Sequence, residues 1–589
     1  MPTNPFKDKI HISQQSVLVI ILSTIVLLPN LVATFVAIDL GSFWMRLCYL
    51  IGSILIFLIP ATVLKARWFF AFHSVTLIIG LVELTHLIIN KATTSLLFVY
   101  TILISETGEA VELWSTAWPL ILIVFLLFIL YWKSIFHRLD NTYLFPSKVR
   151  RYIVYIVLLS VVLFGGAYKA NDQFLNTLEI PIHNEKIRTE YLSFGEKIFP
   201  LNLIMHAYKI GVINQDIENQ KKQLESFSFG IKKQKKRPKE IVVLVIGETA
   251  RYGNFGINGY ARNTTPRLSK RTNLISFDST YAIANLTTVS VPFILSRATP
   301  QTTNLFNKEK SVVEAFQEAG YHTAWIANQS FGNKLLMPIS SSCDYTHYLP
   351  ADITNHQNLD IKLLDYLQPL LDKEKGRQFI VLHSLGCHFK YNCRYPKEFA
   401  QFQPDLNSET DVTAFLDKYN LRKLEDISGK LDNQPLMTEV KTLLVNSYDN
   451  AILYTDYFLD STIERLEKTG KSCILIYVGD HGENLLDDNR RMFLHGTYSG
   501  SAYEYHVPMM VWYSNKYKRL HPQKIAALQE NKSKRMSSMV IFNSLIDMAS
   551  IHYANLDSSL SIVNPQLQNQ DTIWGLDANL KLIEIPTQK

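Results

Sequence analysis

The sequence has few charged residues and few cysteines for its length. Asp, Glu, Lys and Arg make up 19% of its 589 residues, whereas hydrophobic residues make up 47%. Soluble globular proteins have about 25% charged residues, so this balance favours a protein with a large membrane-embedded part. Five cysteines exclude a fold built on disulfides. The net charge of +7 is modest and its basic residues cluster beside apolar segments, so we expect no nucleic-acid partner.

The chain also lacks internal repeats and low-complexity blocks. We expect no cleavable signal peptide, because the first apolar run is too long and further apolar runs follow it. Five runs are long enough, or nearly so, to cross a bilayer, which takes about 20 residues. These predicted spans are Val17–Ile38, Leu47–Leu64, Trp68–Ile89, Trp118–Trp132 and Tyr152–Tyr168.

The positions of Lys and Arg predict the orientation of these spans. Lys7 and Lys9 precede the first span, Lys65 and Arg67 lie between the second and third, and a third basic group lies between the fourth and fifth. These groups fall on one side of the membrane if the N-terminus is cytoplasmic. With five spans, everything after Tyr168 then lies on the far side, which is the periplasm in a Gram-negative bacterium.

A polar stretch, SETGEAVE, interrupts the segment between the third and fourth spans. The apolar part beside it is too short to span and suits a segment that lies in the membrane interface. Glu106, Thr107, Glu109 and Glu112 would then lie at the outer surface of the membrane. They could form a solvated polar turn, or they could contact a lipid headgroup.

Two ionisable residues, Glu83 and His86, lie within the third predicted span. They are one helical turn apart and therefore share a face. Ionisable groups inside a membrane are functional candidates, although side chains near a helix end can also reach the interface. The sequence leaves both interpretations open.

Strand and helix patterns alternate from Glu240 onward, which predicts an α/β sandwich with a mainly parallel sheet. We predict a transmembrane domain at residues 1–170 with an outer-surface loop at 91–117, a connector at 171–239 and an α/β domain at 240–589. Besides two strands treated below, the expected strands are His322–Asn328, Phe379–His383 and Val507–Tyr513. The expected helices lie near Ser311–Ala319, Leu359–Leu371, Glu439–Lys468 and Met539–Ala549.

Two apolar strand patterns end in potential metal ligands. The run that starts at Ile241 ends in Glu248, and the run that starts at Cys473 ends in Asp480 and His481. Strands this apolar are buried on both faces, and α/β folds place their sites at the carboxyl ends of such strands. Glu, Asp and His are ligands for zinc, and they would also suit manganese.

Further histidines lie nearby in the pattern: His383 ends another strand, His388 follows in its loop, and His495 lies downstream of His481. A lone histidine is more often structural, but several ligand types at strand ends predict a metal site. A nucleophile could come from the segment after Tyr281, AIANLTTVSVP, which we expect to be a loop. It offers the hydroxyls of Thr287, Thr288 and Ser290, which need a base or a metal to lower their pKa. Spacing alone does not choose between a nucleophile and an ordinary β-rich loop.

A set of motifs covers the whole second half in order: GETARYGNFGINGYARNTTPRL, LTTVSVP, GCHFKY, NSYDNAI, GDHGE and LHGT. In this order they resemble the phosphoethanolamine transferases, bacterial inner-membrane members of the alkaline phosphatase superfamily. A five-span anchor also fits that family. The resemblance implies an α-helical transmembrane anchor followed by an α/β sandwich of alkaline-phosphatase/sulfatase type.

The resemblance also implies roles for individual residues. The family's nucleophilic Thr lies five residues before a Pro, here Pro292, which selects Thr287. The SETGEAVE stretch resembles the family's outer-surface loop, with imperfect spacing. The implied sets are Glu248, Thr287, Asp480 and His481 for zinc; His388 and His495 for the transferred group or a second zinc; Asn328, Gln329, Ser330 and Lys334 for substrate; and Thr107, Glu109 and Glu112 for the donor at the membrane surface.

The sequence departs from the family at one structural feature. Many members hold the nucleophile loop with a disulfide, and the matching positions here are Ile283 and Phe293, so that bond is absent. Cys387 and Cys393 are close enough in sequence to pair with each other. The Cys- or Ser-x-Pro-x-Arg nucleophile motif of sulfatases does not occur.

The resemblance implies a zinc-dependent enzyme in the bacterial inner membrane with its catalytic domain in the periplasm. It would transfer phosphoethanolamine from phosphatidylethanolamine to lipid A, Kdo or a core sugar through a covalent phosphothreonine. One zinc ion is expected, with two as an alternative. A phosphoglycerol transferase of similar architecture is the first alternative function, and a non-catalytic membrane glycan-binding protein is the second.

Overall fold

The computed structural model contains two compact units; among the residues it describes, one comprises those up to 211 and the other those from 224 onward. Each unit is described by itself. The described residues are 13–586 except for 38–39, 91, 96–97, 100–121, 123–124, 161–196, 212–223, 225, 233–237, 330–335, 350–357, 374–375, 420, 422–433, 498–499 and 578–579.

The first unit contains three apolar helical segments long enough to cross a membrane: Gln14–Val36, Phe43–Thr62 and Ala66–Ile88. They coincide with the first three predicted spans. Large apolar side chains point outward from them, such as Phe35, which is 81% exposed. Their helices are α1 (Gln14–Val36), α2 (Phe43–Leu58) with η2 (Ile59–Thr62), α3 (Ala66–Phe72) and α4 (Ser74–Asn90).

The predicted total of five spans is not confirmed. Phe125–His137, which overlaps the second half of the fourth predicted span, is a shorter apolar helix. The fourth and fifth predicted spans also fall partly on residues outside the described ranges. The finding is therefore a membrane anchor with three candidate spans among the described residues.

Glu83 and His86 of α4 point into the first unit, where both are buried. Oε2 of Glu83 accepts hydrogen bonds from Thr94 Oγ1 at 2.6 Å and from Asn202 Nδ2 at 2.9 Å. Nδ1 of His86 lies 2.9 Å from the carbonyl oxygen of Ala92. Buried polar groups need such partners, and these bonds tie the segment after α4 to the helix at 201–211. The contacts favour a structural role for both residues over contact with the membrane interface.

The second unit is built on a seven-stranded sheet with the order β2-β10-β7-β1-β6-β4-β5. β10 is antiparallel to both of its neighbours, and the pairs from β7 to β5 are parallel, which confirms a mainly parallel sheet. The short strands β2 and β5 were not predicted. The strands are β1 (Glu240–Gly247), β2 (Leu274–Phe277), β4 (His322–Ala327), β5 (Tyr345–Tyr348), β6 (Arg377–His383), β7 (Ser472–Gly479) and β10 (Met509–Tyr513).

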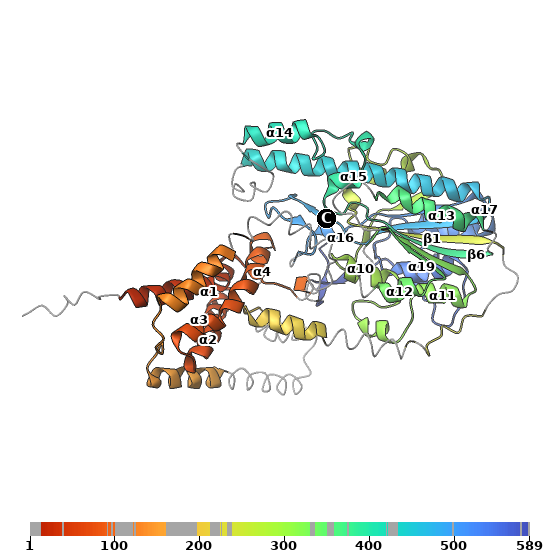
Figure 1. Cartoon of the computed structure of the whole chain (residues 1–589). Helices are drawn as coiled ribbons and strands as arrows, with labels where there is room; N and C mark the ends of the chain where they lie inside the picture. Colours follow the sequence, from red (N-terminus) through yellow and green to blue (C-terminus); the bar gives the residue numbers. More distant parts are fainter. Residues whose placement is uncertain are drawn as a thin grey trace, which may run out of the picture. The chain divides into compact units, whose positions relative to one another are not determined.

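Helices cover both faces of this sheet (Figure 1). Along β1, Val242, Leu244 and Ile246 pack into one hydrophobic core while Ile241 and Val243 pack into the other. This alternation explains the continuous apolar run, because both faces of the strand are buried. The helices are α10 (Thr287–Ile294), α11 (Val312–Glu318) and α19 (Val540–Met548) on the first face, and α13 (Leu363–Asp372) and α15 (Gln434–Lys468) on the second.

Four of these helices, α11, α13, α15 and α19, were predicted. Shorter elements complete the unit: β3 (Thr280–Tyr281), α12 (Met337–Ser341), α14 (Glu409–Lys418), β8 (Asn484–Leu485), β9 (Phe493–Leu494), α16 (Ala502–Tyr505), α17 (Asn515–Leu520), α18 (Pro522–Asn531), β11 (Met536–Ser537), β12 (Trp574–Leu576) and β13 (Leu582–Glu584).

Candidate active site

The register between β1 and β7 brings two carboxylates together. Gly247 pairs with Gly479, so Glu248 and Asp480 leave neighbouring parallel strands at the same level. A Cβ atom on Gly247 would lie 2.3 Å from the hydroxyl oxygen of Tyr477, so the position requires glycine. The carboxyl edge of the sheet is therefore where the predicted metal ligands converge.

Thr287 is the first residue of α10. The sequence had suggested a loop here, and this prediction is wrong from Thr287 onward. Its Oγ1 atom donates a hydrogen bond of 2.9 Å to Glu248 Oε2 and lies 3.1 Å from His481 Nε2. Ser290 is three residues further on the same helical face, and its hydroxyl donates to the carbonyl oxygen of Asp480. Thr288 has a buried hydroxyl without a hydrogen-bond partner among the described residues. The helix therefore turns Thr287 toward the Glu248 carboxylate and Ser290 toward the backbone of Asp480, whereas Thr288 makes neither contact.

Nε2 of His481 is the centre of the cluster. It lies 3.1 Å from Thr287 Oγ1, 3.4 Å from Glu248 Oε1 and 3.6 Å from Asp480 Oδ2. Four ligand atoms around a tetrahedral zinc ion, each about 2 Å away, lie about 3.3 Å from one another. The other ring nitrogen, Nδ1, lies 2.9 Å from the carbonyl oxygen of Gly482, which orients the ring. The spacing of these four side chains fits a tetrahedral metal.

The charges of the cluster also fit a cation. Oδ1 of Asp480 accepts backbone hydrogen bonds from Thr249 and His481, whereas Oδ2 is buried without a hydrogen-bond partner among the described residues. Burial and the negative charge of Glu248 raise the pKa of Asp480. Burial opposes the charge on Glu248 as well, but its hydrogen bond to His481 and the nearby imidazoles hold the pKa of Glu248 well below its usual range. Positive charge between the two carboxylates would relieve their repulsion.

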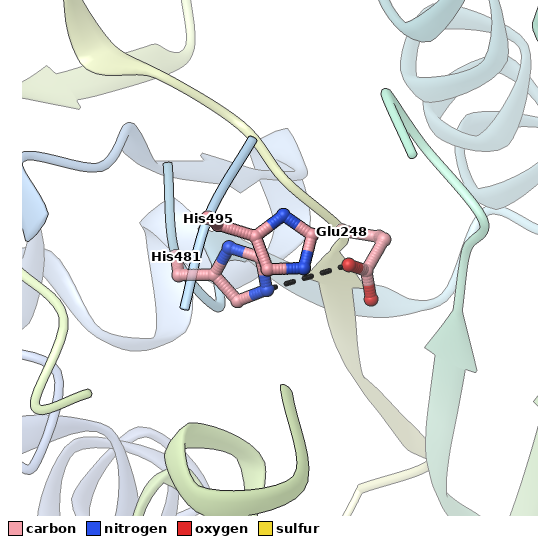
Figure 2. Close-up of side chains that lie close together, drawn as sticks. All are labelled: Glu248, His481 and His495. Atoms are coloured by element: carbon pink, nitrogen blue, oxygen red, sulfur yellow. Dashed lines mark ion pairs between the residues drawn. The ribbon is translucent and has the colours of Figure 1, made fainter. Parts of the chain in front are cut away.

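His495 lies beside this cluster and faces it (Figure 2). One possible ligand atom from each of Glu248, His481 and His495 can be chosen so that all three lie within 4.8 Å of one another. Nδ1 of His495 is 3.3 Å from Oε1 of Glu483, and Oε2 of Glu483 accepts a hydrogen bond from Tyr391. The resemblance had implied that His495 binds the transferred group or a second zinc. In the structure His495 lies next to Glu248 and His481, two of the residues implied for the first zinc.

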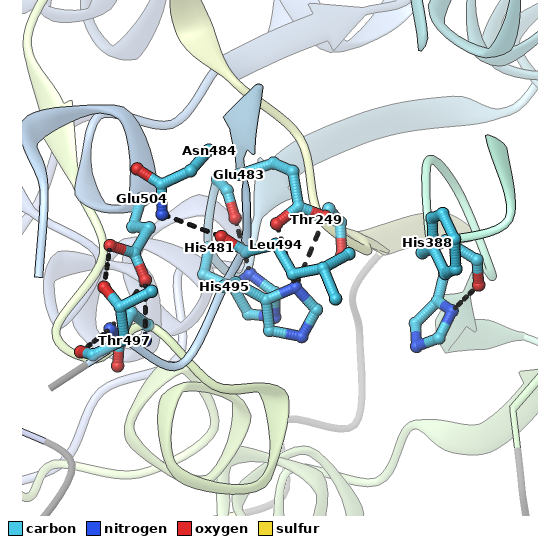
Figure 3. A network of polar contacts seen from close by, with 12 residues as sticks. Thr249, His388, His481, Glu483, Asn484, Leu494, His495, Thr497 and Glu504 are labelled. Carbon is cyan, nitrogen blue, oxygen red and sulfur yellow. Dashed lines mark hydrogen bonds and ion pairs between the residues drawn. The ribbon is translucent and has the colours of Figure 1, made fainter. Parts of the chain in front are cut away.

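His388 stands further away, with its ring 6.2 Å from that of His495 between centroids (Figure 3). Its Nδ1 contacts the carbonyl oxygen of Phe389. Burial lowers the pKa of His388, although the charge of Glu248 opposes this. Asp360 holds the preceding turn through the backbone N–H groups of Leu385 and Gly386. His388 therefore borders the cluster from a separately anchored loop.

The other predicted site residues have different surroundings. Gln329 Nε2 donates to Glu248 Oε2 at 3.2 Å, so Gln329 belongs to the site. Asn328 donates to Asp360 Oδ1. His383 is fully buried, burial lowers its pKa to about 4, and its ring packs edge-on against Trp325 at 5.8 Å. Ser330, Lys334, Thr107, Glu109 and Glu112 lie outside the described residues.

Thr249 is a site residue that sequence reasoning missed. It has a φ of +56°, in the left-handed region where a β-branched residue costs about 1–3 kcal/mol. Its hydroxyl donates to Glu248 Oε1 at 2.8 Å, and Tyr448 donates to its carbonyl oxygen at 2.6 Å. The GETAR and NSYDNAI motifs contain these residues, so the resemblance marked both segments without indicating their contact. The bonds hold Glu248 in place at the strand end.

Comparisons with known proteins place the second unit in a known family. The family model described as Sulfatase matches residues 240–551. The chain is 31% identical over 302 residues to the Kdo(2)-lipid A phosphoethanolamine 7''-transferase of Salmonella typhimurium, which covers 49% of this chain and 47% of that protein. The chain spans about half the length of the curated relatives it matches.

Two solved structures are similar to the chain. One is the C-terminal periplasmic domain of EcEptC from Escherichia coli in complex with Zn, with 25% identity and a TM-score of 0.51, covering 60% of this chain and 95% of that one. The other is the integral membrane protein lipooligosaccharide phosphoethanolamine transferase A (EptA) from Neisseria meningitidis. It has 19% identity and a TM-score of 0.62 and covers 92% of this chain and 98% of that one, so it supports the fold, including the apolar N-terminal helices.

Proposed function

The chain belongs to the Sulfatase family, and from this premise we propose that it is a phosphoethanolamine transferase. The donor is phosphatidylethanolamine, and the acceptor is a hydroxyl of a cell-surface glycan or glycolipid such as lipid A, Kdo or a core sugar. The observation that carries the proposal is the position of the Thr287 hydroxyl, within 2.9 Å of Glu248 and 3.1 Å of His481. A nucleophile of this kind needs a neighbouring base or a metal, and the side chains around Thr287 can serve as metal ligands.

In the first step, Thr287 Oγ1 attacks the phosphorus of the donor and the bond to the diacylglycerol oxygen breaks. The hydroxyl proton passes to an imidazole that borders the cluster, His388 or His495, because Glu248 and His481 face Thr287 with the atoms proposed below as metal ligands. Diacylglycerol leaves after its oxygen gains a proton. The phosphoethanolamine group on Thr287 then lies at the N-terminal end of α10, where the helix dipole stabilises its negative charge.

In the second step, the acceptor hydroxyl attacks the same phosphorus and displaces Thr287. The two steps share one enzyme intermediate, so the reaction follows ping-pong kinetics. His388 and His495 border the cluster and are candidates to move a proton to or from the reacting oxygens, because an imidazole can both accept and donate a proton.

The proposed zinc ligands are Glu248, Thr287, Asp480 and His481. A bound zinc ion supplies Lewis-acid stabilisation of the charge that develops at the hydroxyl and phosphoryl oxygens. The spacing around His481 Nε2 and the buried Oδ2 of Asp480 support this set. The similar domain of EcEptC in complex with Zn also supports zinc. One ion is proposed, and a second near His388 and His495 is the alternative.

The proposed organisation keeps the boundaries expected from the sequence. Residues 1–170 anchor the protein in the inner membrane of a bacterium, and residues 240–589 form the catalytic domain in the periplasm. Residues 171–239 connect these two domains. The donor headgroup contacts Thr107, Glu109 and Glu112 at the membrane surface. Asn328, Gln329, Ser330 and Lys334 are proposed substrate contacts, and the contact between Gln329 and Glu248 supports one of them.

Mass spectrometry of surface lipids from cells with and without the protein tests this function. A glycolipid heavier by one phosphoethanolamine group should appear only in cells that express the protein. A phosphoglycerol increment would instead support the alternative transferase of similar architecture. Identical lipid profiles would contradict both and favour a non-catalytic glycan-binding protein.

A further inference from the structure

Glu504 is a buried carboxylate that does not belong to the proposed metal site. It lies on α16 (Ala502–Tyr505) and is fully inaccessible to solvent. Its Oε1 accepts hydrogen bonds from Asn285 Nδ2 at 2.8 Å and from the backbone N–H of Thr497 at 3.1 Å. Its Oε2 accepts a third bond, of 2.7 Å, from Thr497 Oγ1 (Figure 3). A buried charge persists only with such partners, so the three bonds depend on this carboxylate.

The two residues that Glu504 binds stand next to the proposed chemistry. Asn285 precedes Thr287 by two residues, and Thr497 follows His495 by two residues. The two segments also bind each other, because Asn285 Nδ2 donates to the carbonyl oxygen of Thr497 and the N–H of Gly496 donates to that of Asn285. Glu504 therefore joins the segment that carries the nucleophile to the segment that carries His495.

Hydrogen bonds, and no disulfide, hold the segment before Thr287 in place. The N–H of Ala282 donates to the carbonyl oxygen of Tyr505, and the N–H of Leu576 donates to that of Ile283. None of the five cysteines forms a disulfide in the structure, and Ile283 and Phe293 occupy the positions that match the disulfide of the resembled family. Fixing a loop costs conformational entropy, which these hydrogen bonds must offset. The Glu504 side chain contacts both segments from a third one, α16.

We propose that Glu504 is a positioning residue that fixes Thr287 relative to His495 by binding Asn285 and Thr497 together. It acts through these two residues and does not touch the metal ligands or the substrate. The effect of Glu504 on the reaction rate rests on the proposed transferase function. Its effect on the positions of the two segments rests only on the hydrogen bonds.

Glu504→Ala tests the proposal in the full-length protein, because it removes both acceptor oxygens. Hydrogen exchange followed by mass spectrometry should show faster exchange in two peptides together, one over residues 283–295 and one over 493–497. The expected increase is about tenfold or more, since hydrogen bonds to a buried charge are stronger than neutral ones and their loss favours local opening.

The same variant should turn over more slowly. We expect kcat for diacylglycerol release per folded molecule to fall about tenfold or more, because small displacements of a nucleophile cost that much. The KM for phosphatidylethanolamine vesicles and the zinc content should change little, because Glu504 binds neither. Glu504→Gln should restore most of kcat, since its remaining oxygen can still accept from Asn285 and Thr497.

Glu240→Ala is the matched control. Glu240 is also buried and accepts a hydrogen bond from Tyr321, but it lies at the opposite end of β1 from Glu248. The Glu240→Ala variant should have lower thermal stability, but hydrogen exchange in the two peptides and kcat should stay as in the wild-type protein. If Glu504→Ala does not fold, Asn285→Ala removes one side of the connection and should loosen residues 283–295 and lower kcat.

Unchanged exchange in either peptide of Glu504→Ala would overturn the proposal, and so would an unchanged kcat in an active protein. If the wild-type protein transfers no phosphoethanolamine, the proposed function fails separately. The exchange experiment then decides alone whether Glu504 holds the two segments together.

Discussion

The hydroxyl of Thr287 donates a hydrogen bond of 2.9 Å to Oε2 of Glu248, across 39 residues of sequence. Glu248 follows a buried strand, and Thr287 begins a helix that packs against the same sheet. The bond directs the hydroxyl oxygen toward the cluster around His481. It is the structural basis for treating Thr287, and not its neighbour Thr288, as the nucleophile.

Thr287→Ala should abolish transfer while leaving the fold intact. Removing a catalytic nucleophile typically lowers the rate by several orders of magnitude. Thr287→Ser should keep part of the activity, because the hydroxyl remains while the lost methyl group frees its rotamer. Transfer rates with purified protein, measured beside circular dichroism, check both variants.

Thr288→Ala is the control for that experiment. Its hydroxyl is buried without a partner among the described residues, so its loss should have a mild effect on the rate. A severe loss in Thr288→Ala together with an active Thr287→Ala would reverse the assignment of the nucleophile.

Asp480→Ala and His481→Ala should each lower the zinc content of folded protein. Each removes one of the atoms spaced for a tetrahedral ion, and three ligands bind zinc less well than four. Elemental analysis of the purified variants provides the measurement. His322→Ala, at the far end of β4, should retain zinc. Full occupancy in both site variants would show that the ion binds elsewhere.

The orientation of the chain in the membrane gives a third prediction. A reporter enzyme that works only in the periplasm should be active when fused after Glu240, because the basic loops predict a cytoplasmic N-terminus. A fusion after Lys65 should be inactive. The reverse pattern would remove the catalytic unit from the compartment of its proposed lipid substrates.

The polar stretch between the third and fourth predicted spans gives a fourth prediction. Replacing Glu106, Thr107, Glu109 and Glu112 together should lower activity toward phosphatidylethanolamine in full-length protein, if these residues contact the donor headgroup. Activity toward a short water-soluble donor should be much less affected. Equal activity toward the lipid donor before and after replacement would favour the solvated-turn interpretation.

The sequence predicted the centre of the sheet well, for a physical reason. β1 and β7 are buried on both faces, so their continuous apolar runs are distinctive, and each ends in a polar ligand. Glu248, Asp480 and His481 became candidate site residues because they follow those strand ends. The pairing of Gly247 with Gly479, which sets the carboxylates side by side, is a tertiary property that no local pattern encodes.

The helix at Thr287 could not be predicted from local pattern. Residues 287–294 contain β-branched side chains and Pro292, which favour other conformations, and tertiary packing stabilises the helix. The choice between Thr287 and Thr288 therefore rested on resemblance until the helical periodicity was seen. The role of Glu504 was equally hidden, because Asn285 and Glu504 lie 219 residues apart.

The most direct test of the account is the covalent intermediate. Protein incubated with phosphatidylethanolamine without an acceptor, then digested and analysed by mass spectrometry, should yield a Thr287 peptide heavier by one phosphoethanolamine group. Thr287→Ala should give no such peptide. An adduct on Thr288 or Ser290, or transfer by Thr287→Ala without any adduct, would contradict the account.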